Sequence, residues 1–156
     1  MSLTTFLPVI LSSHILLALG LILPSLLLPF ALRRGVPGDR AGTSTRGLLW
    51  LQANGTLIFG FGLALTGILL VLAIGPAVLT QGWLAVALVI YATNLVLAFF
   101  IQRPNLRGLL GATPTDDPQA EARWQARARR QRYVSYAMAL AVGMIAFLMS
   151  TKPTLW

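Results

Sequence analysis

The chain has 156 residues, of which 56% are hydrophobic and 10% are charged, and its mean hydropathy is +0.77. Soluble domains carry about 25% charged residues, so the composition excludes an ordinary soluble fold and indicates an integral membrane protein. The net charge is +8 and cysteine is absent, which excludes disulfides, thiolate metal sites and a cysteine nucleophile.

Four apolar segments without charged residues are predicted to be transmembrane helices, because about 20 residues cross the hydrocarbon core of a bilayer. The first lacks a preceding basic segment and is longer than the core of a signal peptide, so we expect it to be retained. It contains Pro24 and Pro29, which can kink a helix. The predicted fold is an all-α, four-transmembrane-helix bundle, a single membrane domain over 1–156, with spans at about 6–32, 47–74, 83–101 and 133–150.

Every basic residue except Lys152, and every acidic residue, lies in two links on the same side of the predicted membrane, 33–46 and 102–132. The positive-inside rule makes this side cytoplasmic and places both termini on the exterior or periplasmic side of the bacterial cytoplasmic (inner) membrane. Because these arginines flank apolar spans, their expected partners are anionic lipids and not nucleic acid.

The second link contains the pair Asp117-Pro118, an N-cap followed by a proline at the first helical position. A helix is predicted from this pair without a break into the fourth span. Its length of roughly 50 Å exceeds the hydrocarbon core, so it is expected to project into the cytoplasm or bend along the membrane surface. The basic residues that would contact lipid headgroups or dock an acidic partner are Arg33, Arg34, Arg123, Arg127 and Arg130.

Small residues four apart predict where helices approach closely, since helix association in lipid depends on tight packing. They occur as Gly60 and Ala64 in the second span and as Ser135, Ala139 and Gly143 in the fourth. Whether these faces meet helices of this chain or of another is left open. Asn94, near the middle of the third span, is expected to hydrogen-bond to a neighbouring helix.

His14 is the only ionisable residue within a predicted span, and such residues are candidates for function. A neutral imidazole could bind the iron of a haem or the magnesium of a (bacterio)chlorophyll. The alternative is a histidine that hydrogen-bonds to a neighbouring helix. The single histidine excludes bis-histidine ligation within the chain, and no metal cluster, HExxH, GxSxG, P-loop or dinucleotide motif is found, so no catalytic residue is predicted.

Three features together carry a resemblance to a known family: His14 in the first span, the glycines from Gly62 to Gly67 in the second, and MSTKP at 149–153. On these features the chain resembles a family of small, four-helix, predicted integral membrane proteins of bacteria, of unknown function. The same layout is more distantly similar to HemJ-type protoporphyrinogen oxidases and CopD-type copper-resistance proteins. The distant resemblance implies a haem-binding membrane oxidoreductase with His14 as an axial ligand.

The leading functional prediction is a non-catalytic accessory or assembly subunit, packed against other membrane subunits of a larger energy-transducing complex, respiratory or photosynthetic. Small-residue faces, the absence of catalytic motifs and the long basic helix favour it. The run after His14 is almost wholly apolar, unlike that of HemJ-type proteins, so haem-dependent oxidoreduction is the alternative. A small channel or transporter is the third hypothesis.

Overall fold

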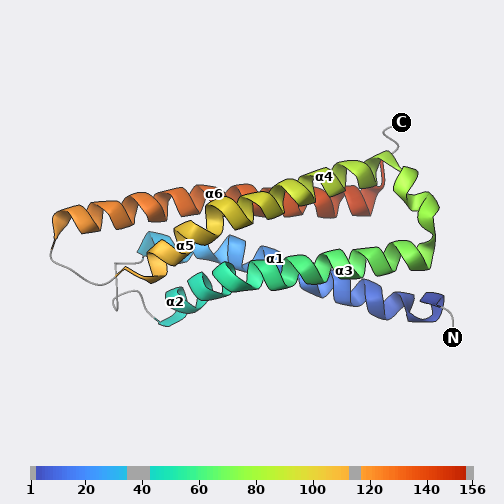
Figure 1. Cartoon of the computed structure of the whole chain (residues 1–156), viewed down its shortest axis with the longest axis horizontal. Helices are drawn as coiled ribbons and strands as arrows, with labels where there is room; N and C mark the ends of the chain where they lie inside the picture. Colours follow the sequence, from blue (N-terminus) through green and yellow to red (C-terminus); the bar gives the residue numbers. More distant parts are fainter. Residues whose placement is uncertain (1–2, 35–42, 113–116, 154–156) are drawn as a thin grey trace.

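The computed structural model describes residues 3–34, 43–112 and 117–153, and every element in these ranges is a helix. Four continuous helices are long and apolar enough to cross a membrane: Leu7–Leu32, Thr45–Ile74, Gly82–Leu110 and Pro118–Thr151. They lie side by side as an elongated bundle (Figure 1). The predicted all-α architecture with four apolar helices is therefore confirmed.

The first half of the chain forms two long helices. A short 3-10 helix, η1 (Leu3–Phe6), leads into α1 (Leu7–Arg34), which contains Pro24 and Pro29. The next long helix has three parts, namely α2 (Thr43–Trp50), a π-helical turn η3 (Leu51–Gly55), and α3 (Thr56–Ile74). It ends at Gly75, whose φ of 116° is readily adopted only by glycine.

The third long helix, like the second, is interrupted by a π-helical turn. The 3-10 helix η4 (Pro76–Thr80) leads to α4 (Gly82–Leu97), a second π-helical turn η5 (Ala98–Gln102), and α5 (Arg103–Leu110). This helix does not end at Ile101, where the predicted span ends. In a regular α-helix the ring of Pro104 would meet the carbonyl of Phe100, and the wider π turn directly before α5 lets the helix continue.

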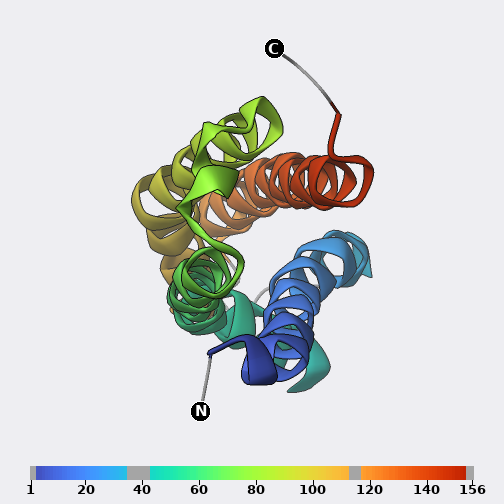
Figure 2. The same ribbon diagram turned by 90° about the vertical axis from the view of Figure 1, so that its right-hand side faces the viewer.

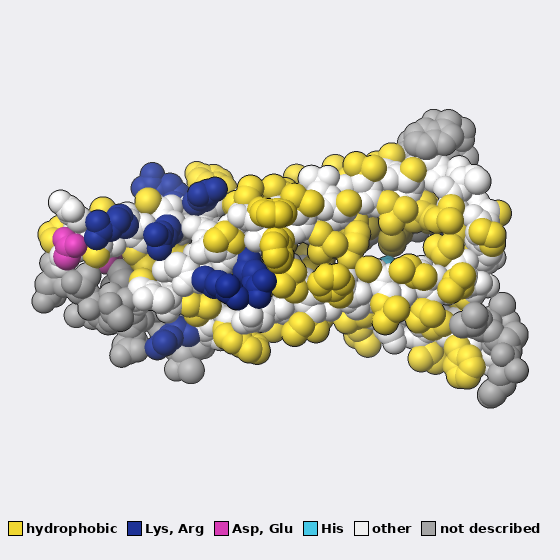
Figure 3. Space-filling model, in the orientation of Figure 1, with side chains coloured by type: hydrophobic (Ala, Val, Ile, Leu, Met, Phe, Trp, Pro, Cys, Tyr) yellow, Lys and Arg dark blue, Asp and Glu magenta, His cyan; other side chains and the backbone are white. Residues whose placement is uncertain are grey.

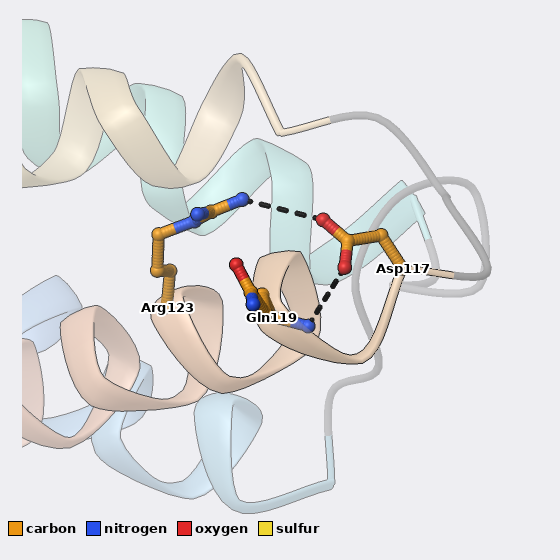
Figure 4. Close-up of polar contacts among 3 residues, drawn as sticks. All are labelled: Asp117, Gln119 and Arg123. Carbon is orange, nitrogen blue, oxygen red and sulfur yellow. Dashed lines mark hydrogen bonds and ion pairs between the residues drawn. The ribbon is translucent and has the colours of Figure 1, made fainter.

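The last helix, α6 (Pro118–Thr151), has 34 residues and starts where the Asp117-Pro118 pair predicts. The carboxylate of Asp117 accepts a hydrogen bond from the backbone N–H of Gln119 at 2.9 Å, which caps the helix (Figure 4). A second oxygen of Asp117 pairs with Arg123 at 3.4 Å, and both side chains are exposed.

We call the end of the bundle at which α1 ends and α6 begins the basic end, because the described arginine side chains gather there (Figure 3). All four long helices contribute to its core, which consists of Leu28, Leu32, Leu49, Ala53, Leu106, Leu109, Trp124 and Ala128. The first part of α6 takes part in this core through Trp124 and Ala128.

At the opposite end the bundle divides into two helix pairs. α1 packs against α3, and α4 packs against α6. A second core cluster of Trp83, Leu84, Ala87 and Leu148 belongs to the α4–α6 pair alone. The two pairs diverge in the end-on view of Figure 2, and the space-filling view of Figure 3 shows a hollow between them. Both ends of the described chain lie at this end of the bundle (Figure 1).

Candidate functional site

His14 lies two turns into α1 and is only 8% exposed. Its Nδ1 is 2.8 Å from the hydroxyl oxygen of Thr66 on α3. Gly67, the next residue of α3, leaves room for the ring, since a Cβ added there would lie 3.6 Å from its Cε1. The imidazole of His14 on α1 therefore packs closely against α3, at a position where α3 has a glycine.

The hydrogen bonds of Thr66 determine which nitrogen of His14 carries the proton. The Thr66 hydroxyl lies 2.8 Å from the carbonyl oxygen of Gly62 and 3.1 Å from that of Leu63. Its single hydrogen is donated to these carbonyls, so its oxygen accepts from Nδ1–H of the neutral imidazole. The lone pair of His14 is consequently on Nε2.

An imidazole whose Nδ1–H is held by a fixed acceptor presents Nε2 as a metal ligand. In Figure 3 the histidine colour appears in the hollow between the two helix pairs, and the chain has one histidine. Within the described ranges no three His, Asp or Glu residues gather as a metal site, so His14 would supply a single protein ligand. This donor type fits the iron of a haem or the magnesium of a chlorophyll.

Asn94 is 5% exposed on α4, and its side-chain oxygen has no hydrogen-bond partner among the described residues. It borders a cavity of about 10 Å³ that is also lined by Thr56 of α3 and Tyr91 of α4. This space corresponds to about one water molecule. Here the cross-helix bond is instead made by Tyr91, which donates to the carbonyl of Gly60 at 2.6 Å.

Gly60 and Gly143, which the sequence treats alike, have different surroundings. A Cβ added at Gly60 would lie 2.9 Å from a methyl carbon of Leu95, so α3 and α4 approach closely there. A Cβ added at Gly143 would meet nothing within 4 Å. Gly143 and Ala139 line an open groove instead, whereas Ser135 is fully buried and Ala64 is half-buried.

The predicted basic face of α6 is exposed at Arg123, Arg127 and Arg130. Arg127 also lies over α5, because a Cβ added at Gly108 would be 2.5 Å from its Nη1. Arg33 and Arg34 close α1, and their side chains lie outside the described part of the structure.

The chain matches, over residues 9–153, a family described as a predicted integral membrane protein (DUF2269). The protein belongs to this family. It is therefore a multi-pass integral membrane protein of unknown function with four candidate membrane helices. The predicted family resemblance is confirmed at this level. No curated protein and no solved structure matches the chain.

The sequence reasoning missed two buried glutamines of this DUF2269 protein. Gln102 is 1% exposed, and both polar atoms of its side chain lack a partner among the described residues. Gln131 is fully buried and bridges helices, since its oxygen accepts from Asn105 at 2.9 Å and its amide donates to Ser135 at 3.2 Å. The sequence predicts that both lie in the link 102–132. Helical spacing could have indicated their burial, because each glutamine continues the buried face of the adjoining span.

Gln52 is a third buried glutamine, in the helix formed by α2, η3 and α3. It is 2% exposed in the π turn η3 and donates to the hydroxyl of Ser25 on α1 at 2.9 Å. Gln102 occupies the other π turn, η5. Each π turn therefore carries a buried glutamine, and such turns are frequent at functional sites.

Proposed function

We propose that the protein is a non-catalytic accessory or assembly subunit of a larger energy-transducing membrane complex, respiratory or photosynthetic. Its membrane would be the bacterial cytoplasmic (inner) membrane, with the basic end in the cytoplasm. The observation that supports a subunit role is the poor coverage of α3. Only 6% of the most apolar 18-residue stretch of the helix that contains α3 is buried, compared with 22–33% of the corresponding stretch in each of the other three long helices.

The uncovered side of α3 carries a regular seam of large side chains. The seam consists of Ile58, Phe61, Leu65, Ile68 and Leu72, which are 58–69% exposed. Their spacing alternates between three and four residues, the pattern by which one helix inserts side chains into the surface of another. Lipid supplies no hydrophobic driving force between helices, so such regular packing is what makes a partner helix bind.

The glycines of α3 explain why the seam is free for a partner. Gly62 packs against Leu17 of α1, and Gly60 packs against Leu95 of α4. These small residues bring the neighbouring helices of the same chain onto the other sides of α3. A partner helix on the seam would complete the coverage of the span.

Site-specific photocrosslinking in native membranes tests this proposal. A photoreactive residue replaces Leu65 in the seam or, as a matched control, Val89, which is 66% exposed on α4. We expect the Leu65 probe to capture one membrane protein that also co-purifies without crosslinking, and the Val89 probe to label lipid. Identification of the captured protein by mass spectrometry reports whether the complex is respiratory or photosynthetic. Labelling of lipid alone at both positions, with a chain that purifies as a monomer, would exclude the subunit role.

A HemJ-like haem-binding membrane oxidoreductase is the second candidate. The orientation of His14 favours it, because Thr66 fixes Nδ1–H and leaves Nε2 available. An absorption spectrum of the protein purified gently from its membrane should then show a Soret band that His14→Ala abolishes. Thr66→Val should keep the band and weaken haem retention by about 10-fold or more, as loss of an outer-shell partner does. A folded wild type that stays colourless after incubation with haem would exclude this function.

A further inference from the structure

An open groove of about 480 Å³ runs along the outer surface between α1 and α6. Ala139 and Gly143 form its floor, and its walls are Leu26, Tyr136, Leu140, Met144 and Phe147. The wall residues are 38–69% exposed. Because a Cβ at Gly143 would meet no atom within 4 Å, the missing side chain itself deepens the groove.

The groove has the length of one bilayer leaflet. From Tyr136 to Phe147 the axis of α6 advances about 17 Å, at about 1.5 Å per residue. Half of the hydrocarbon core is about 15 Å. The groove therefore offers one acyl chain an apolar path from the basic end towards the middle of the membrane.

Two arginines stand on the groove face of α6, at its basic end. Residues seven apart on an α-helix lie on nearly the same side, which places Arg129 in line with Tyr136 and Gly143, and Arg132 in line with Ala139. Arg129 is exposed and Arg132 is half-buried. Neither has an ion pair or hydrogen bond within the described part of the chain.

The other arginines of α6 face elsewhere. Arg123 is already paired with Asp117, and Arg127 is packed over Gly108. Arg130 is exposed and lies about 100° around the helix from Arg129. Among the described side chains of α6, the positive charge at the groove entrance thus comes from Arg129 and Arg132, and no described acidic residue pairs with either.

We propose that this groove is a binding site for one anionic phospholipid of the leaflet at the basic end. One acyl chain lies between α1 and α6 over Gly143, and the phosphate is bound by Arg129 and Arg132. Guanidinium groups match phosphate oxygens in charge and in hydrogen-bond geometry. The site is independent of the α3 seam, so it stands or fails separately from the subunit role.

Native mass spectrometry of the delipidated full chain tests the site, with phosphatidylglycerol and phosphatidylcholine of identical acyl chains as probes. Wild type should bind one phosphatidylglycerol in preference to phosphatidylcholine. Arg129→Gln and Arg132→Gln should each weaken phosphatidylglycerol binding by about fivefold, the effect expected of one arginine near anionic lipid. Arg130→Gln removes the same charge from a different face and should leave binding unchanged.

A second pair of variants tests the acyl-chain path. Gly143→Leu fills the groove and should weaken both lipids at least 10-fold, whereas Ala92→Leu, at an exposed position on α4, should weaken neither. Equal losses in Arg129→Gln and Arg130→Gln would reduce the effect to net charge and overturn the proposal. It would also fail if Gly143→Leu bound both lipids like wild type, or if it dissociated a dimer or released a protein partner, since another helix would then occupy the groove.

Discussion

Gly60 and Gly143 provide a paired test of the helix arrangement, since the same substitution should destabilise the protein at Gly60 and have little effect at Gly143. At Gly60 an added Cβ would lie 2.9 Å from Leu95 and 4.0 Å from the hydroxyl of Tyr91. Alanine requires only a shift of one Leu95 methyl group. Valine adds two more carbons and forces α3 away from α4, which costs about 1–3 kcal/mol of unfolding free energy. The same shift weakens the hydrogen bond from Tyr91 to the Gly60 carbonyl, for which membrane proteins average about 0.6 kcal/mol.

Gly143→Val should change the unfolding free energy by less than about 0.5 kcal/mol, the usual effect at a surface position. The measurement is reversible unfolding in mild detergent by titration with a denaturing detergent, followed by circular dichroism. Tyr91→Phe measures the hydrogen-bond part by itself. Equal destabilisation by Gly60→Val and Gly143→Val would refute the packing described, because a helix of the same chain would then have to contact Gly143.

Four further substitutions test the basic end, each by the same unfolding measurement. Asp117→Ala removes the cap of α6 and should cost about 0.5–2 kcal/mol, whereas Arg123→Ala, which breaks only an exposed ion pair, should cost less than about 1 kcal/mol. Trp124→Ala should cost about 3–5 kcal/mol, because the side chain is 6% exposed in the core shared by all four helices, and a loss below about 1 kcal/mol would contradict that core. Gln131→Leu removes the hydrogen bonds with Asn105 and Ser135 and should cost about 1–3 kcal/mol, while no loss would show that the bridge contributes nothing.

The number of helices and the start of α6 follow directly from the sequence. Long uncharged apolar segments are stable in lipid as helices. The Asp117-Pro118 pair starts a helix locally, because the side chain of Asp117 accepts a hydrogen bond from a backbone N–H of the first turn. The continuation of the third helix to Leu110 could not be predicted in this way. It depends on a π turn that accommodates Pro104 and on the burial of Leu106 and Leu109 in a core built by distant segments.

The candidate site was predicted only in part. The sequence singles out His14, since it is the one histidine and no Lys, Arg, Asp or Glu lies within a predicted span, but its partner Thr66 is 52 residues away and is brought close by packing. Gly60 and Gly143 look equivalent because spacing reports which residues share a face and not what that face contacts. The sequence predicts that Gln102 and Gln131 lie in a link, because hydropathy alone cannot distinguish a polar residue in water from one buried between helices.

The mass and composition of the particle released from native membranes show whether the chain is a subunit of a larger complex. The chain would carry an affinity tag, be extracted with its surrounding lipid and be measured by native mass spectrometry, beside a variant with Leu65→Ala and Ile68→Ala in the α3 seam. We expect a particle that contains this chain in fixed ratio with other membrane subunits, and a folded variant that has lost them. A wild-type chain that is released alone, with the same mass as the variant, would contradict the subunit role.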